Sequence, residues 1–264
     1  MQIRLDEEFK TIQDVAAKLT EFETFCLEKG DLRGVFATAY LNITHAISDQ
    51  ISTAFHDPEW VESYLIRFGN LYREALQNYE SGSTIPVPKS WFIAFESAKR
   101  GEGFIIQHLI LGINAHINHD LAISLFDVGI DPGRSDKYHD HTRVNNILQS
   151  ATKHLKREVF TKYAPILERL DHSTGQISDD VTNFSIPKAR EHAWTFAMAL
   201  TNAKSQAERT ILRRALDEQA GVLARLIMAS PTKNPRITRS VSMAKRIDSI
   251  STRLFSLFRR RNND

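Results

Sequence analysis

The chain has little cysteine, and it lacks long apolar runs. Its 264 residues include one cysteine, Cys26. A single cysteine excludes a disulfide framework and a cysteine-based zinc or iron–sulfur site, and it suits a reducing cytoplasm. No apolar run reaches the ~18 residues of a membrane span, and the charged start MQIRLDEEF lacks the apolar stretch of a signal peptide. The sequence therefore predicts a cytoplasmic protein that does not span a membrane.

Several phosphate-binding and catalytic motifs are also missing. The chain contains no Gly-x-Gly-x-x-Gly after a strand, no P-loop, no Gly-x-Ser-x-Gly elbow and no His-Glu-x-x-His. These absences argue against dinucleotide-dependent redox chemistry, P-loop nucleotide hydrolysis and α/β-hydrolase chemistry.

Glycine and proline are sparse as well. The chain has 11 glycines and 8 prolines among 264 residues, and this combined share of about 7% is well below the usual share of about 12%. Most lie between apolar-periodic stretches, and no strand-period run of useful length occurs, so the sequence predicts an all-α fold. Thr11 and Asp57-Pro58 are expected to begin helices, and Gly30 to end one. The expected helices are 11–28, 31–55, 57–79, 88–97, 102–126, 138–163, 165–171, 187–201, 205–229 and 237–261. We predict a single-domain bundle of roughly eight or nine helices around a buried central helix, residues 1–230. A linker and a basic C-terminal helix, residues 231–264, follow it.

The predicted central helix, 102–126, is apolar on nearly every side, which is typical of a helix packed by neighbours all around. It nevertheless carries polar residues in two arcs. Gln107, Asn114 and Asn118 share one direction at 3.6 residues per turn, and His116 and Asp120 share another. Because an unpaired buried polar group costs about 1–3 kcal/mol, we expect several of these side chains to have partners.

His116 and Asp120 are four residues apart, so their side chains lie next to each other on one helix face. Gly112, one turn earlier, allows a partner helix or a ligand to approach the backbone. Three interpretations remain open: a half-site for a divalent metal, a general base with its orienting carboxylate, or a buried pair that only fixes packing. The candidate catalytic residues are His116, Asp120 and Asn114.

Five of the ten histidines fall between residues 108 and 141. His139-Asp140-His141 follows the loop after the central helix and is expected to fold back over the end of that helix. Asp140 therefore joins His116 and Asp120 as the candidate metal-ligand set, with His141 as an alternative to it. Arg190, on a later helix, needs an acidic partner if it is partly buried. Two functions stay open: a metal-assisted hydrolase with a buried His/Asn/Asp pocket, or a non-catalytic binding protein for an apolar or lipid-like ligand.

Residues 111–121, Leu-Gly-Ile-Asn-Ala-His-Ile-Asn-His-Asp-Leu, resemble the core motif of an uncharacterised bacterial all-helical family. The family's motif is Gly-[Ile/Met]-Asn-Ala-His-Ile-Asn-x-Asp-Leu. A stretch before this motif, around Trp91, and two after it, around Asp140 and Arg190, resemble other parts of the family's pattern, so the resemblance covers about residues 34–229. It implies that the following residues belong to one shared polar core: Asn114, His116, Asp120, Asp140, Arg143, Asn145, Arg190 and Trp194. It names no activity.

The formal net charge of +2 hides an uneven distribution. From Arg225 onward there are 10 Lys/Arg and 2 Asp/Glu, which leaves 24 against 30 in the first 224 residues. Residues 237–261 combine this positive charge with apolar residues at three- and four-residue steps, a pattern typical of helices that lie on membrane surfaces. We expect this segment to bind an anionic membrane surface or to dock on the acidic body. Nucleic acid is not an expected partner, because no base-reading fold is recognisable.

Overall fold

The fold of the described residues is entirely helical. The computed structural model describes residues 7–133, 135–164 and 185–229, and within these ranges it has no strand. The helices are α1 (Ile12–Lys29), α2 (Gly34–Ser48), α3 (Ile51–Ala54), α4 (Pro58–Ser81), α5 (Lys89–Lys99), α6 (Ile105–Ala115), the π-helical turn η1 (His116–Asp120), α7 (Leu121–Val128), α8 (Ser135–Tyr163), α11 (Ile186–Asn202) and α12 (Gln206–Ala229). The predicted all-α single-domain bundle is confirmed.

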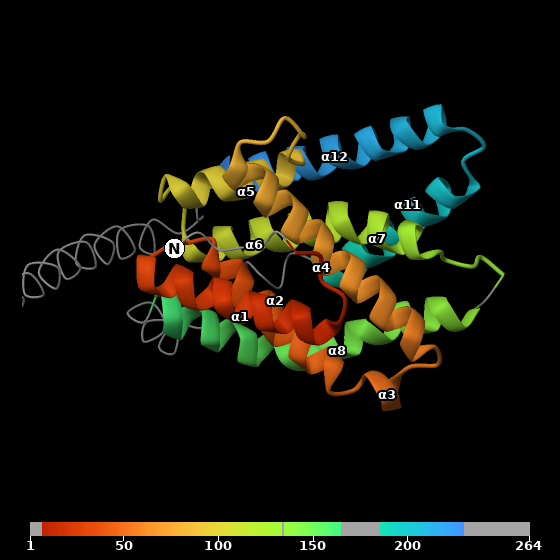
Figure 1. Ribbon diagram of the computed structural model, residues 1–264, viewed down its shortest axis with the longest axis horizontal. Helices are drawn as coiled ribbons and strands as arrows, with labels where there is room; N and C mark the ends of the chain where they lie inside the picture. The colour runs from red at the N-terminus through yellow and green to blue at the C-terminus, as the bar shows by residue number, and fades with distance from the viewer. Residues whose placement is uncertain (1–6, 134, 165–184, 230–264) are drawn as a thin grey trace, which may run out of the picture.

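The continuous run α6–η1–α7 passes through the middle of the bundle (Figure 1). Helices α5 and α12 pack against α6 on one side, and α2 packs against it on the other. Helices α1 and α8 both flank α2, while α4 crosses η1 and α7, and α11 lies along α7. Helices α2, α4, α5, α11 and α12 therefore all pack against the central run.

The burial of the central run follows from its composition. Every residue from Ile106 to Leu125 is buried except Ile113, which is half-buried. The expectation of a helix that is apolar all round and packed on every side is thus met. Its polar side chains lie inside the protein and depend on partners from neighbouring helices.

Helix ends follow local chemistry where the sequence carries it. Thr11 caps α1 in a capping box with Asp14, and Gly30 ends α1 with a left-handed φ of 64°. Asp57 caps α4 by accepting a hydrogen bond from the backbone N–H of Trp60 at 3.1 Å. These predicted boundaries are confirmed.

Two predicted helices differ from the structure. The helix expected over 31–55 is divided into α2 and α3, because the chain turns at Asp49 and Gln50. The central helix begins at Ile105 rather than Glu102, since Gly101 and Gly103 have φ values of 62° and 84°, outside the α-helical region. The helices expected over 165–171 and 237–261 lie outside the described residues.

Within the described ranges, no helix combines the length and the apolar character needed to cross a membrane.

Candidate functional site

The central helix changes its winding where its polar residues lie. Residues 116–120 form a single π-helical turn, in which the N–H of Leu121 bonds to the carbonyl of His116. A π turn inserts one residue into an α-helix, and such turns are frequent at functional sites. The same five residues carry His116, His119 and Asp120, so the irregular winding and the candidate chemistry coincide.

The Asp120 carboxylate is the centre of this cluster. Its Oδ2 accepts hydrogen bonds from His116 Nδ1 at 3.1 Å and from Trp91 Nε1 at 2.8 Å. Its Oδ1 accepts one from His119 Nδ1 at 2.8 Å. Three N–H donors therefore surround one buried carboxylate, and the expected contact between His116 and Asp120 is present.

Burial and hydrogen bonding decide the charges of this pair. Desolvation opposes ionisation of Asp120, but the hydrogen bonds from His116 and His119 outweigh it and hold the pKa of the carboxyl below its ordinary value. Burial lowers the pKa of His116, and the attraction of Asp120 opposes this without reversing it. At neutral pH the imidazole is therefore neutral and donates its Nδ1–H to an ionised carboxylate.

The His116 ring is held flat between aromatic side chains. It stacks on Phe68 with centroids 3.3 Å apart and planes 11° apart, and the Tyr40 ring meets it at 4.4 Å. With Nδ1 bound to Asp120, the other ring nitrogen, Nε2, carries the lone pair. This buried Nε2 has no hydrogen-bond partner among the described residues.

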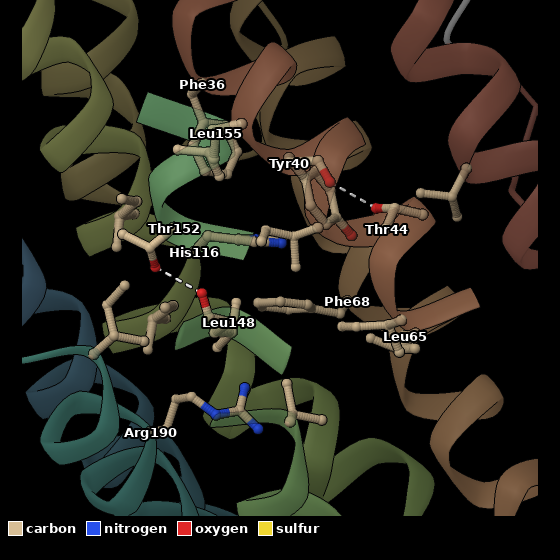
Figure 2. Close-up of a pocket in the computed structure, with 18 of the residues that line it drawn as sticks. Phe36, Tyr40, Thr44, Leu65, Phe68, His116, Leu148, Thr152, Leu155 and Arg190 are labelled. Atoms are coloured by element: carbon tan, nitrogen blue, oxygen red, sulfur yellow. Dashed lines mark hydrogen bonds between the residues drawn. The ribbon is translucent and has the colours of Figure 1, made fainter. Parts of the chain in front are cut away.

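His116 lines a cavity between α2, α4, α8, α11 and the π-helical turn. About 90 Å³ of this cavity is open to the centres of water-sized molecules, and a single water needs about 10–15 Å³ on the same measure. In Figure 2, His116 and Phe68 lie parallel near the middle, with Leu155 and Phe36 toward one end and Arg190 at the other. The lining is mostly apolar.

The polar side chains on the cavity wall fall into two groups. Thr44 and Thr152 donate their hydroxyls to the carbonyls of Tyr40 and Leu148 in their own helices, at 2.8 and 2.6 Å (Figure 2). By contrast, three buried polar atoms on this wall have no hydrogen-bond partner among the described residues: His116 Nε2, the Tyr64 hydroxyl and Arg190 Nε. All three side chains line the cavity.

Arg190 is buried, with 3% of its surface exposed. One terminal nitrogen, Nη2, donates to the carbonyl of His141 at 2.7 Å, and His141 Nε2 donates to the carbonyl of Arg190 at 3.1 Å. The sequence predicts an acidic partner for this arginine. No carboxylate of the described residues forms an ion pair with it, so that prediction is wrong for this part of the chain.

Asn114, the third candidate catalytic residue, lies on another side of the central run. Its side-chain N–H donates to the carbonyl of Ala220 in α12 at 2.9 Å, and its oxygen accepts from Asn118 at 3.0 Å. Gln107 likewise donates to the carbonyl of Ile227 at 2.8 Å. The predicted arc of amides is confirmed, and it joins α6 to α12. The structure does not bring Asn114 into the cavity with His116.

The candidate metal set of His116, Asp120 and Asp140 is not assembled. Both oxygens of Asp140 accept backbone N–H groups, from His56 at 2.8 Å and from Asp57 at 2.7 Å. His116 and His119 both donate a hydrogen bond from Nδ1 to the carboxylate of Asp120. Among the described residues, no three His, Cys, Asp or Glu side chains are placed to hold a metal ion. Both oxygens of Asp120 and of Asp140 and Nδ1 of His116 are committed to hydrogen bonds inside the protein, which leaves only Nε2 of His116 unpaired in this set.

The polar core implied by the resemblance is divided in space. His116 and Arg190 face one cavity, while Asn114 faces α12 and Asp140 bonds to the chain before α4. Arg143 is exposed and is not part of a buried core.

Comparison with known proteins places this arrangement in a family. The family of unknown function DUF5995 matches residues 12–230. The chain belongs to this family. No curated protein and no solved structure matches the chain significantly. The match covers every residue that lines the cavity, including Ile12 and Val15 of α1, whereas the basic segment, residues 237–261, lies beyond it.

Three residues of the site were not found by sequence reasoning. Trp91 donates to Asp120, Phe68 supports the imidazole, and Tyr64 brings a hydroxyl to the cavity. Trp91 and Phe68 look in the sequence like ordinary core aromatics. Only Tyr64, a phenol on the apolar face of a helix, carried a detectable signal.

Proposed function

We propose that this member of DUF5995 binds an apolar, lipid-like ligand in the cavity beside His116. The support is the combination of an apolar lining with three buried polar atoms that have no protein partner. Ligand sites typically combine such a lining with a few polar groups that fix orientation. His116 Nε2 is an acceptor, so it binds a hydroxyl of the ligand or a water molecule that accompanies it.

The size of the cavity restricts the ligand. Its volume of about 90 Å³ is enough for about six to nine water molecules. A single acyl chain of medium length fits this space, whereas a two-chain phospholipid does not.

Cavity filling tests the proposal. Leu148 lines the cavity, and Leu148→Trp places an indole in the ligand's space. Leu226→Trp makes the same change at a side chain that is 58% exposed on α12. We expect the neutral dye N-phenylnaphthylamine to fluoresce with the wild type and with Leu226→Trp, and not with Leu148→Trp. Circular dichroism verifies that both variants fold. Equal dye binding by all three proteins contradicts the proposal.

A second function, hydrolysis of an ester ligand, is favoured by one observation. His116 binds Asp120 through Nδ1 and reaches the cavity with a free Nε2, which is the arrangement of a general base with its orienting carboxylate. Nε2 would take a proton from water as the water oxygen attacks the ester carbonyl. The imidazolium would then return that proton to the departing alkoxide, giving an acid and an alcohol.

Hydrolysis of p-nitrophenyl octanoate tests this second function. His116→Gln should slow it by about a hundredfold or more, the usual contribution of a general base. His154→Gln is the control, because that imidazole is 75% exposed on α8. If His116→Gln leaves the rate unchanged, His116 is not a general base for esters.

We further propose a cytoplasmic protein that attaches to membrane surfaces through residues 237–261. The support is the sequence alone: basic residues around an apolar stripe, next to a body of opposite net charge. A lipid-like ligand would be available to the cavity at such a surface.

A further inference from the structure

The end of the cavity at which Arg190 lies indicates which charge the ligand carries. This inference rests on the proposed function, because it concerns the ligand of the same cavity. We propose that the ligand is a single-chain carboxylate, whose anionic group is bound by Arg190 and the Tyr64 hydroxyl and whose chain extends past Phe68 toward Leu155.

The charge of Arg190 has no acidic partner among the described residues. A guanidinium remains protonated at neutral pH even in a buried position. Buried charges in proteins are normally paired, because leaving water is unfavourable for an unpaired ion. Arg190 is 3% exposed, its Nε has no partner, and no carboxylate of the described residues pairs with it. A ligand anion would supply the missing partner.

Tyr64 lies on the cavity wall beside Arg190. Its hydroxyl is buried without a hydrogen-bond partner, and both Tyr64 and Arg190 line the cavity. The two side chains are close neighbours: burial raises the pKa of Tyr64, and the adjacent Arg190 partly opposes this. A phenol O–H and a guanidinium side by side both donate, and a carboxylate is an acceptor that satisfies both.

The cavity changes from charged to apolar along its length. Arg190 stands at one end in Figure 2, and Leu155 and Phe36 stand toward the other, with Phe68 between them. An amphiphile with its charge at one end and an apolar chain behind it matches this order. The volume equivalent of about six to nine water-sized bodies suits a chain of about eight carbons.

Competition against N-phenylnaphthylamine in the full-length protein tests the inference, with octanoate and 1-octanol as competitors. They share the chain and differ in charge. We expect octanoate to bind at least tenfold more tightly than 1-octanol. Tyr64→Phe, which keeps the ring beside Trp60, should weaken octanoate several-fold and leave octanol and the dye unchanged. Arg190→Gln should weaken octanoate about ten- to a hundredfold, the usual worth of a hydrogen bond to a charged group.

Arg213→Gln is the matched control, because it removes one positive charge from a partly exposed side chain that contacts Asp127 rather than the cavity. It should leave both competitors unchanged. Arg190→Gln removes a hydrogen bond to the carbonyl of His141, so binding of the dye is used to verify that the cavity of this variant is intact. If Arg190→Gln does not fold, Tyr64→Phe alone tests the carboxylate inference.

The outcomes separate the two proposals. Equal affinities for octanoate and octanol, or an unchanged octanoate affinity in Tyr64→Phe and Arg190→Gln, overturn the carboxylate inference while the apolar binding function stands. If neither competitor nor dye binds the wild type, the proposed function fails and the inference fails with it.

Discussion

The imidazole of His116 lies flat against the ring of Phe68, with centroids 3.3 Å apart and planes 11° apart. This stack comes from two helices, because Phe68 belongs to α4 and His116 to the π-helical turn. It fixes the plane of the imidazole, so that Nδ1 meets Asp120 while Nε2 remains unpaired. The stack thus fixes the plane of the ring, and the hydrogen bond from Nδ1 to Asp120 decides that Nε2 is the nitrogen left for a ligand.

Replacing Asp120 by asparagine should destabilise the protein strongly. The carboxylate accepts from His116, His119 and Trp91, and an amide keeps only one accepting oxygen and adds two donors among the existing ones. We expect the free energy of unfolding to fall by about 2–5 kcal/mol, measured by urea denaturation. Asp127→Asn, a change at a partly exposed carboxylate, should cost less than about 1 kcal/mol. Similar losses in both variants would contradict the central role of Asp120.

Gly112→Ala should also destabilise the protein, although alanine favours helices over glycine by about 1 kcal/mol. A Cβ at this position would lie 2.3 Å from Cγ of Phe36, a buried ring of α2. The partner that approaches Gly112 is thus a helix. We expect a net loss of about 2 kcal/mol from overpacking, with a lower midpoint in thermal denaturation.

Gly133→Ala is the matched control, since its Cβ would meet Asp131 at an ordinary 3.5 Å. Its stability should remain within about 0.5 kcal/mol of the wild type. A gain in stability for Gly112→Ala would show that α2 can move away from α6 at little cost.

Two of the buried histidines, His116 and His141, should make the protein less stable in mild acid. Burial lowers the pKa of His116, and burial together with the charge of Arg190 lowers that of His141 well below its ordinary value. Below about pH 6.5 the unfolded chain therefore binds protons that the folded protein excludes, so stability is complete above that pH and is lost as the pH falls. We expect a decline of up to about 1.4 kcal/mol per pH unit for each histidine.

Urea denaturation at pH 7.5, 6.5 and 5.5 measures this decline. His141→Gln should reduce the slope by about 1.4 kcal/mol per pH unit, whereas His154→Gln, at an exposed position, should leave it unchanged. Asp120 does not contribute in this range, because its pKa lies below 3.8. Equal slopes in wild type and His141→Gln would show that His141 accepts a proton in the folded state.

The basic segment should bind anionic membranes in a salt-dependent manner. We expect the full chain to sediment with phosphatidylserine vesicles at low salt and to remain in solution with phosphatidylcholine vesicles. Exchanging Arg259, Arg260 and Arg261 for glutamine should weaken this binding by about 1 kcal/mol per charge. Lys204→Gln, an exposed position before α12, is the control. Unchanged sedimentation of the triple variant would show that these three arginines do not carry the membrane binding.

Local sequence was sufficient for several parts of the structure. Thr11, Gly30 and Asp57 set helix ends because their capping chemistry operates over a few residues. The burial of the central run follows from apolar residues on all its sides. Four-residue spacing brought His116 to Asp120, and it also brought Asn118 to Asn114.

Other features depend on long-range contacts, and no local pattern encodes them. The π-helical turn changes the winding of the central helix at His116. A helical wheel cannot predict this change, because it assumes the same number of residues per turn throughout. Asp140 was expected beside His116, but the amides of His56 and Asp57, more than eighty residues earlier in the chain, occupy it. Arg190 was expected to have an acidic partner. Its side chain instead lines the cavity, with no carboxylate of the described residues paired to it.

The sequence by itself determined an all-helical domain, its buried central helix and the contact between His116 and Asp120, because these follow from periodicity and capping within single helices. Only the tertiary structure decided which polar groups remain without a partner. His116 Nε2, the Tyr64 hydroxyl and Arg190 Nε come from three separate helical segments, and the cavity that they share exists only where those segments pack together.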